Sequence, residues 1–338
     1  MTEEEPLKSK FDSATQAVFN PLLEEQICTL YEGRHHYGLA AFLNSLVHKG
    51  YNGRVWVGYR GNLPPWIHQL QAQAPREAGG DTTPCFMLAG QICVHFVPVN
   101  PPVHMANFKP DFMLLIFKHY APECSYLWYF DSDIFLFYFW KYFSFWQRCG
   151  VALCADINYR VLDDNSPMRG HWKQFAREIG LGQSRPLNQH FNSGLLCVAR
   201  DQISFLELWS RILTEIGLHG YDLCSFMPGS RELPFYAIDQ DALNITAMYS
   251  EHALSPLGRS GMGFETGGAV LYHTVGAKPW NGTLKRALNG HPPTSGIRYY
   301  FTQVDGPIKP YTWPGLRMRK FACSLSNFIG RFYMRPHI

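Results

Sequence analysis

The stretch SYLWYFDSDIFLF, residues 125–137, decides the fold, because it places two carboxylates directly after an apolar segment. The residues before Asp131 are apolar on both faces of a strand, which is typical of a central parallel strand. In open α/β sheets, ligands bind at the carboxyl ends of such strands. The stretch therefore predicts an α/β fold with Asp131 and Asp133 at the ligand-binding edge of the sheet.

The surrounding sequence supports a parallel sheet. A strand pattern at 26–33, a helical pattern at 37–50 and a second strand pattern at 54–61 follow one another, as in a βαβ unit. Further on, 190–200 reads as a strand and 203–217 as a helix, whereas 72–84 and 158–186 read as loops. We expect an N-terminal arm (1–24), one main domain (25–290) and a basic, aromatic C-terminal extension (291–338).

The two carboxylates predict a cation. Unpaired carboxylates among aromatic side chains would be costly to desolvate, and a bound ion removes that cost. Oxygen ligands suit Mg²⁺ or Mn²⁺, which usually keep phosphate oxygens among their ligands. The alternative is a surface loop, where this short pattern arises by chance.

The stretch HTVGAKPW, residues 273–280, directly follows another strand pattern. His273 offers an imidazole to a metal ion, and Lys278 offers a point charge to a phosphate group. Gly276 allows close approach of the backbone, and Pro279 stiffens the turn.

Four motifs in this order resemble glycosyltransferase family 8, the family of glycogenin and of lipooligosaccharide galactosyltransferases. They are Asp131-Ser132-Asp133, Asn192-Ser193-Gly194, Asp239-Gln240-Asp241 and the His273–Trp280 stretch. The resemblance spans roughly residues 25–285. It implies a GT-A fold, a Rossmann-like and mostly parallel sheet flanked by helices, together with a nucleotide-sugar donor, usually a UDP-sugar, Mn²⁺ (or Mg²⁺), and retention at the anomeric carbon.

The resemblance also implies roles for single residues. Asp131, Asp133 and His273 would bind the metal, and Asp239, Gln240 and Asn192 would act near the reacting carbon. The donor would be bound by Lys109, Asp131, Ser132, Asp133, Asn192, Gly194, Gly276 and Lys278. Because Gln240 is a poor nucleophile, we favour a same-face reaction over a covalent sugar intermediate.

Each role has an ordinary alternative. Asp239 or Asp241 could cap a helix, Gly194 could mark a strand bulge, and either lysine could be solvated. The family's usual base-reading pair after the first strand is missing; Tyr31 could stack on a base instead, which leaves the base undecided.

Composition limits the partners. A net charge of +3, with basic residues spread along 338 positions, does not indicate a nucleic-acid binder. The acceptor could be a glycan, a lipid-linked saccharide or a small molecule. The N-terminus lacks an apolar signal, so we expect a cytoplasmic protein; the C-terminal tail could contact a membrane or a second copy of the chain in a homodimer.

Two further stretches carry expectations. Nine cysteines without a C-x-x-C pair predict reduced, packed thiols and not a structural zinc site. Residues 134–146 predict a buried helix. Rival functions for the whole chain are a sugar-nucleotide nucleotidyltransferase or hydrolase, and a non-catalytic binding protein.

Overall fold

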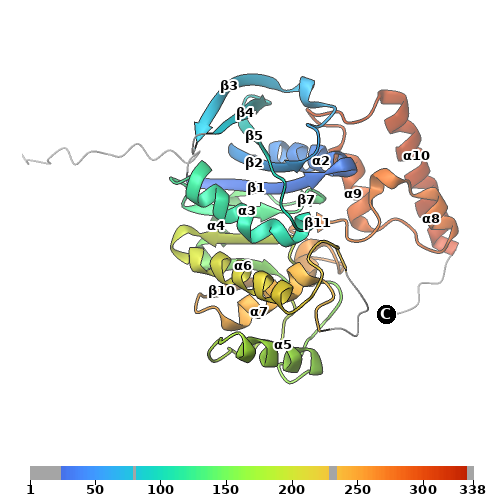
Figure 1. Ribbon diagram of the computed structural model, residues 1–338. Helices are drawn as coiled ribbons and strands as arrows, with labels where there is room; N and C mark the ends of the chain where they lie inside the picture. Colours follow the sequence, from blue (N-terminus) through green and yellow to red (C-terminus); the bar gives the residue numbers. More distant parts are fainter. Residues whose placement is uncertain (1–23, 79–80, 228–233, 333–338) are drawn as a thin grey trace, which may run out of the picture.

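The computed structural model describes residues 24–78, 81–227 and 234–332 (Figure 1). The arm expected over 1–24 lies outside this part of the chain except for Glu24. In the described part no helix is long and apolar enough to cross a membrane.

Nine strands form one mixed sheet, in the order β10-β8-β9-β6-β1-β2-β5-β4-β3. The pairs β1–β2, β1–β6, β2–β5 and β8–β10 are parallel, and the other four pairs are antiparallel. The strands are β1 (Glu25–Glu32), β2 (Gly53–Arg60), β3 (Gln71–Ala78), β4 (Asp81–Leu88), β5 (Ile92–Pro98), β6 (Tyr126–Phe130), β8 (Val151–Cys154), β9 (Leu195–Ala199) and β10 (Leu254–Leu257).

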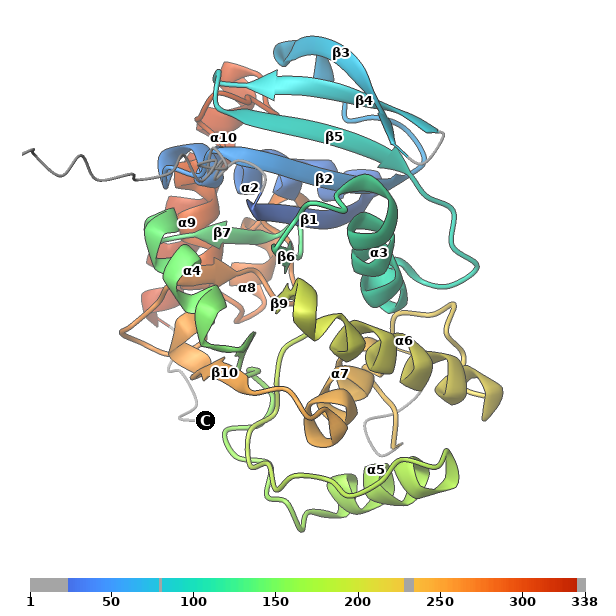
Figure 2. The same ribbon diagram turned by 90° about the vertical axis from the view of Figure 1, so that its left-hand side faces the viewer.

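Helices cover both faces of this sheet (Figure 2). One face packs on α2 (His36–His48), α4 (Trp140–Trp146) and α9 (Ser295–Gln303). The other packs on α3 (Lys109–Leu115), α5 (Pro167–Glu178), α6 (Ile203–Leu218) and α7 (Ile238–Tyr249). The α/β prediction is confirmed, and β6 is a buried central strand as expected.

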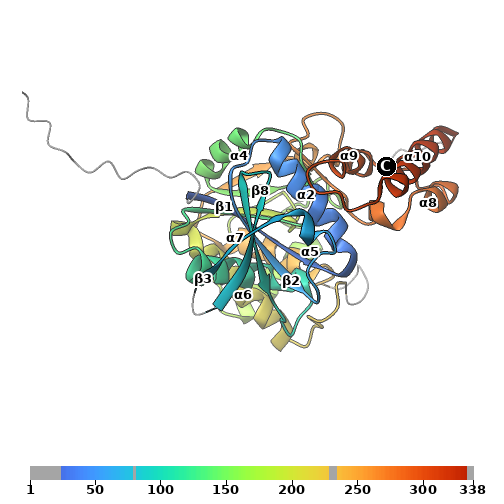
Figure 3. The ribbon, with the colours of Figure 1, turned by 90° about the horizontal axis from the view of Figure 1, so that it is seen from above.

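The C-terminal part forms α8 (Leu284–Leu288), α9 and α10 (Trp313–Ile329), which lie together at one side of the molecule (Figure 3). A buried amide of α2 makes several of the bonds that join α9 and the segment after it to this helix. Asn44 Nδ2 donates to the carbonyls of Gln303 and Ile308, each at 2.8 Å, and its Oδ1 accepts from the Ile308 N–H at 2.9 Å.

Three expectations about elements are wrong. Residues 72–84 form most of β3 and β4, with Pro75 and Pro84 located where the β3–β4 register shifts and no ladder bond is needed. The presumed loop 158–186 contains α5, which begins after Ser166, whose hydroxyl accepts from the Arg169 N–H. Residues 134–146 divide into β7 (Ile134–Leu136) and α4.

The arrangement of β1 and β6 fixes the position of the site. The chain leaves β1 toward β2 on one side, whereas β6 lies on its other side. The carboxyl ends of these two parallel strands therefore border the crevice where such folds bind ligands.

Candidate functional site

The pairing of β7 with β11 (Leu271–His273) joins two distant parts of the chain. The two strands form a separate antiparallel sheet in which His273 lies opposite Ile134. Asp133 is the residue before β7, and its carbonyl accepts from the Thr274 N–H at 3.2 Å. The short sheet thus places the histidine beside the two aspartates.

Asp131, Asp133 and His273 form a compact ligand set. One ligand atom from each lies within 4.8 Å of the others. His273 Nε2 is 3.4 Å from Asp133 Oδ1 and 3.9 Å from Asp131 Oδ2. Its Nδ1 is buried and has no hydrogen-bond partner among the described residues. Two carboxylates and one imidazole are a donor set that fits Mn²⁺ or Mg²⁺.

Gly194 is part of this geometry because it has no side chain. A Cβ at Gly194 would lie 2.7 Å from Asp131 Oδ2 and 2.8 Å from His273 Cε1. The Asp131 N–H also donates to the Gly194 carbonyl at 2.8 Å. Any other residue would separate the aspartate from the histidine.

Lys278 neutralises Asp133. Its ammonium contacts Asp133 Oδ2 and donates to the Thr274 carbonyl at 3.0 Å. Burial alone would raise the pKa of the Asp133 carboxyl, but Lys278 and His273 outweigh burial and hold that pKa well below its usual range. Asp133 is therefore ionised, as a metal ligand must be.

Lys109 is the second cation at the site and, unlike the partly exposed Lys278, it is buried. Its Nζ lies 2.9 Å from Asp239 Oδ2 and 3.2 Å from Asp131 Oδ1, and it also donates to Ser193. Burial lowers the pKa of Lys109, but the two carboxylates outweigh that effect and raise it. Asp239 also accepts from the Ser193 hydroxyl at 2.6 Å. Lys109 thus links Asp239 to the presumed metal ligands.

Asn192 and Gln240 touch each other. Asn192 Nδ2 is 3.2 Å from Gln240 Oε1 and donates to Asp156 Oδ1 at 2.8 Å. The sequence analysis missed Asp156, although it follows the apolar strand β8 as Asp131 follows β6. Asp156 is 1% exposed and fixes the orientation of Asn192.

The remaining motif residues have local roles. Asp241 caps the start of α7, since its Oδ2 accepts from the N–H groups of Tyr236 and Ala237 at 2.8 and 3.0 Å. Ser132 is buried, and Gly276 has a positive φ of 76° that favours glycine.

Tyr31 does not join the cluster. It is 3% exposed at the end of β1, and its hydroxyl donates to the Asn62 carbonyl at 3.0 Å. His35, which was not among the residues selected from the sequence, lies close enough to Asp133 and Lys278 for their charges to act on it. Burial lowers the pKa of His35, and the charges of Asp133 and Lys278 act on it in opposite directions.

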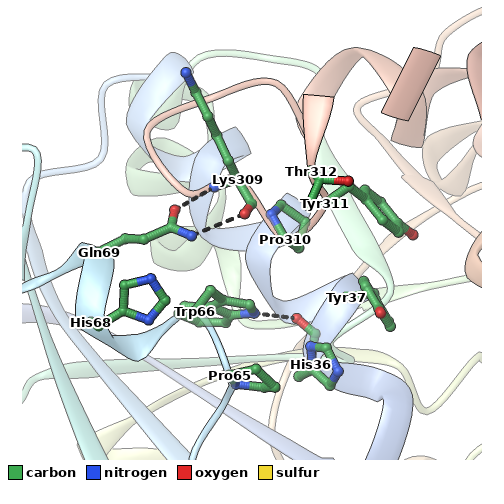
Figure 4. Close-up of a pocket in the computed structure, with 10 residues that line it drawn as sticks. All are labelled: His36, Tyr37, Pro65, Trp66, His68, Gln69, Lys309, Pro310, Tyr311 and Thr312. Carbon is green, nitrogen blue, oxygen red and sulfur yellow. Dashed lines mark hydrogen bonds between the residues drawn. The ribbon is translucent and has the colours of Figure 1, made fainter. Parts of the chain in front are cut away.

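A groove of about 430 Å³ is lined at one end by His36 and Tyr37 (Figure 4). Its walls come from the start of α2, the loop after β2 and the segment before α10. Tyr37 stacks on Tyr311, with ring centroids 4.8 Å apart, and Trp66 Nε1 donates to the His36 carbonyl at 3.1 Å. Its volume is within the range of small-molecule sites.

Among solved structures, the bifunctional glycosyltransferase WbbM is similar over 88% of this chain, with 11% sequence identity and a TM-score of 0.51. The fold is that of a GT-A glycosyltransferase. The chain spans about half (52%) of WbbM. Galactosyltransferase LgtC, in complex with donor and acceptor sugar analogues, matches 86% of the chain and is itself covered to 99%, at 16% identity and a TM-score of 0.47. Neither a protein-family model nor a curated protein matches the sequence.

Proposed function

We propose that this protein is a metal-dependent glycosyltransferase that takes a sugar from a nucleoside-diphosphate donor. One observation carries the proposal: Asp131 and Asp133 meet His273 and Lys278, 140 or so positions later in the chain, at the carboxyl edge of the sheet. Carboxylates, an imidazole and an ammonium group together match the needs of a divalent ion and a diphosphate.

The chain's own residues have distinct tasks in this proposal. A divalent ion held by Asp131, Asp133 and His273 would act as a Lewis acid toward the diphosphate. Lys278 and the backbone at Gly276 bind the phosphate groups, and Lys278 stabilises the charge that develops on them. Lys109 holds Asp131 and Asp239 in place, close to the donor.

The sugar would bind against Asn192, Gln240 and Asp239. Asp239 is held by Lys109 and Ser193, and Asp156 is held by Asn192 and Asn158, so neither carboxylate is poised as a nucleophile. This favours transfer on the same face with retention. Proton NMR of the product gives the anomeric configuration, and a covalent sugar adduct seen by intact mass would contradict the route.

The donor base and the acceptor are also proposals. Uracil, in a UDP-sugar donor, is the base expected from the family resemblance, with Tyr31 reaching it only after moving from its bond to Asn62. The groove lined by His36 and Tyr37 is proposed as the acceptor site, because its stacked tyrosines offer an apolar platform and its rim is polar.

The decisive experiment is a thermal-shift panel of nucleoside diphosphates and nucleotide sugars, with and without Mn²⁺, followed by transfer assays with the donor that binds. A ligand at 100 times its Kd stabilises the folded state by about 2.7 kcal/mol. We expect stabilisation that requires both the ion and the diphosphate. Asp133→Asn should abolish it and lower turnover by about 100-fold or more.

The matched control is Asp305→Asn, which changes an exposed aspartate. Its behaviour should equal that of the wild type. Release of pyrophosphate from a nucleoside triphosphate and a sugar 1-phosphate would indicate a nucleotidyltransferase. Release of free sugar, or of sugar 1-phosphate and nucleoside monophosphate, with every acceptor tested would indicate a hydrolase, and binding without turnover would indicate a binding protein. Each of these results contradicts the proposal.

The exposed apolar side chains of α10 support a membrane contact at a cytoplasmic surface. Met318, Phe321 and Phe328 recur at helical spacing and are more than half exposed, with Arg317 and Lys320 beside them. We expect the protein to float with vesicles containing phosphatidylserine and not with neutral vesicles, and Phe321→Ser to weaken the flotation. A dimer in solution that buries α10, with no flotation, would contradict this contact.

A further inference from the structure

A second group of potential metal-binding side chains lies on β4 and β5, which β1 and β2 separate from β6 in the sheet. Cys93 and His95 are two positions apart on β5, so both point to the same face. Cys85 on β4 is directly opposite His95 in the antiparallel register. The hairpin alone therefore gathers two thiols and an imidazole.

The distances among the three side chains fit ligands of one metal ion. His95 Nε2 lies 3.4 Å from Cys93 Sγ and 3.9 Å from Cys85 Sγ, and one ligand atom of each residue lies within 4.8 Å of the others. Two sulfurs bound tetrahedrally at about 2.3 Å from one zinc ion are about 3.8 Å apart. The three side chains thus need only small rotations to bind one ion.

The surroundings hold the imidazole in place and bury most of the ligand set. Trp56 on β2 stacks on the His95 ring, with centroids 4.2 Å apart and planes 17° apart. Cys85 and His95 are buried, whereas Cys93 is partly exposed.

We propose that Cys85, Cys93 and His95 bind a Zn²⁺ ion, with a solvent molecule as the fourth ligand on the exposed side of Cys93. Sulfur and imidazole ligands suit Zn²⁺ and exclude Mg²⁺ and Mn²⁺, so this site is chemically distinct from the one at Asp131. Binding releases thiol protons. The ion would cross-link β4 and β5 at the edge of the sheet that β3 completes.

A disulfide is the competing use of these thiols, and the register disfavours it. Cys93 lies opposite Met87 and Cys85 opposite His95, so the two cysteines are diagonal neighbours. Diagonal neighbours are about 7–8 Å apart, beyond the usual Cα separation of a disulfide. An ion spans the wider gap without moving the backbone.

The site lacks one feature of tight zinc sites. His95 Nδ1 is buried with no hydrogen-bond partner among the described residues, whereas the second nitrogen of a zinc-bound histidine usually donates to a carbonyl or carboxylate. Loss of such a partner costs about 10–100-fold in affinity. We therefore expect an exchangeable ion and not a permanently bound one.

The test uses Co²⁺ as a spectroscopic substitute for Zn²⁺ in the reduced, full-length protein. One equivalent of Co²⁺ should produce thiolate-to-cobalt charge-transfer absorption, which Zn²⁺ then removes. Cys85→Ser and Cys93→Ser should each lose this band, and His95→Gln should weaken binding by more than about 100-fold, since it removes a ligand and not merely a partner of one. Asp133→Asn should keep the band, because carboxylates cannot produce it.

Two controls protect the interpretation. Cys149→Ser and Cys224→Ser change exposed thiols elsewhere and should retain the band. The wild-type protein alone gives a second readout: Zn²⁺ should slow alkylation of Cys93 while Cys149 and Cys224 react as before, so the test does not depend on a variant that folds. Absence of the band in the wild type, its persistence in the Cys85→Ser/Cys93→Ser double variant, or a Cys85–Cys93 disulfide formed in the presence of Zn²⁺ would overturn the proposal.

Discussion

The Lys278 side chain places a positive charge of the protein itself beside Asp133, in the cluster proposed to bind a metal ion. Its ammonium contacts the same Asp133 carboxylate that we assign to a metal ion. The lysine therefore both stabilises the buried acid and competes with an incoming ion. Its two effects can be separated, since a diphosphate donor benefits from the lysine, whereas an ion on its own does not.

Lys278→Met should tighten Mn²⁺ binding in the absence of donor by about tenfold, which corresponds to removal of about 1.4 kcal/mol of charge repulsion. The same variant should weaken nucleoside-diphosphate binding by about tenfold or more. Isothermal titration of each ligand measures both changes. Lys118→Met, which breaks an exposed pair with Glu207, is the control and should change neither. A parallel loss of both affinities would contradict the competition.

Gly38 allows α2 to approach the aspartate loop closely, because it has no side chain. A Cβ there would lie 2.5 Å from the Ser132 carbonyl oxygen and 2.8 Å from Trp280 Cη2. Gly38→Ala should lower the free energy of unfolding by about 1–3 kcal/mol, despite alanine's better helix propensity. Gly170→Ala in α5 meets nothing within 4 Å and should stabilise by up to about 1 kcal/mol. Equal effects of the two substitutions in urea unfolding would show that the contact is unimportant.

Asp241 makes stability depend on pH. Burial, which outweighs its two backbone hydrogen bonds, raises the pKa of its carboxyl from 3.8 to about 8. Between these values the folded protein holds a proton that the unfolded chain releases, so the free energy of unfolding should fall as pH rises from about 4 to about 8. Asp241→Asn keeps the acceptor but cannot titrate, and urea unfolding across this range should show a shallower slope. An unchanged slope would exclude Asp241 as its source.

At the scale of elements, the β4–β5 turn contains a strained alanine. Ala89 has φ = 50° and Gly90 has φ = 71°, and the Gln91 N–H donates to the Leu88 carbonyl at 3.1 Å, so both central residues of this turn have the positive φ that favours Asn-Gly or Gly-Gly. Ala89→Gly should raise the free energy of unfolding by about 1 kcal/mol, the cost of the left-handed conformation for alanine. Ala322→Gly in α10 should lower it by about the same amount. Thermal unfolding compares the two, and destabilisation by both would contradict the strain.

The elements also show which patterns a sequence reveals. The long apolar or amphipathic runs of β1, α2, β6 and α6 were predicted correctly, because burial on a fixed face leaves a regular pattern. β3 and β4 were missed, because their prolines suggested a loop while a register shift accommodates them. The turn after Leu136 was missed, because a continuous aromatic run has no periodicity to divide it.

At the scale of the whole molecule, the C-terminal helices depend on Asn44. Asn44→Ala would leave the Ile308 N–H and two carbonyls buried without partners, at about 1–3 kcal/mol for each unsatisfied group. We expect the free energy of unfolding to fall by about 3 kcal/mol or more in urea unfolding. Asn52→Ala, at an exposed position, should change it by less than about 0.5 kcal/mol. A loss below 1 kcal/mol at Asn44 would mean that water replaces the amide.

The site was predicted from the order of its motifs and not from any one of them. Asp131, Asp133, His273 and Lys278 meet as the sequence indicated, because strand ends collect at one edge of an α/β sheet. The hydrogen bonds of Asp156 could not be predicted from the sequence, because the pattern does not distinguish a buried lone aspartate after a strand from a solvated one. Tyr31 was selected for a ring that in fact fills the core, because sequence position alone does not say which way a side chain points.

The candidate site needs the short β7–β11 sheet, so it can form only after β11 has been synthesised. Lys278 follows Asp133 by 145 positions, so on a ribosome adding about 5–20 residues per second the aspartates emerge on the order of ten seconds before their partner. Until β11 has been synthesised, the chain has no His273 to place beside the carboxylates of Asp131 and Asp133. A nascent chain stalled before Leu271 can build most of the large sheet and still lack the histidine of the proposed ion site, so that site cannot form before β11 has been synthesised.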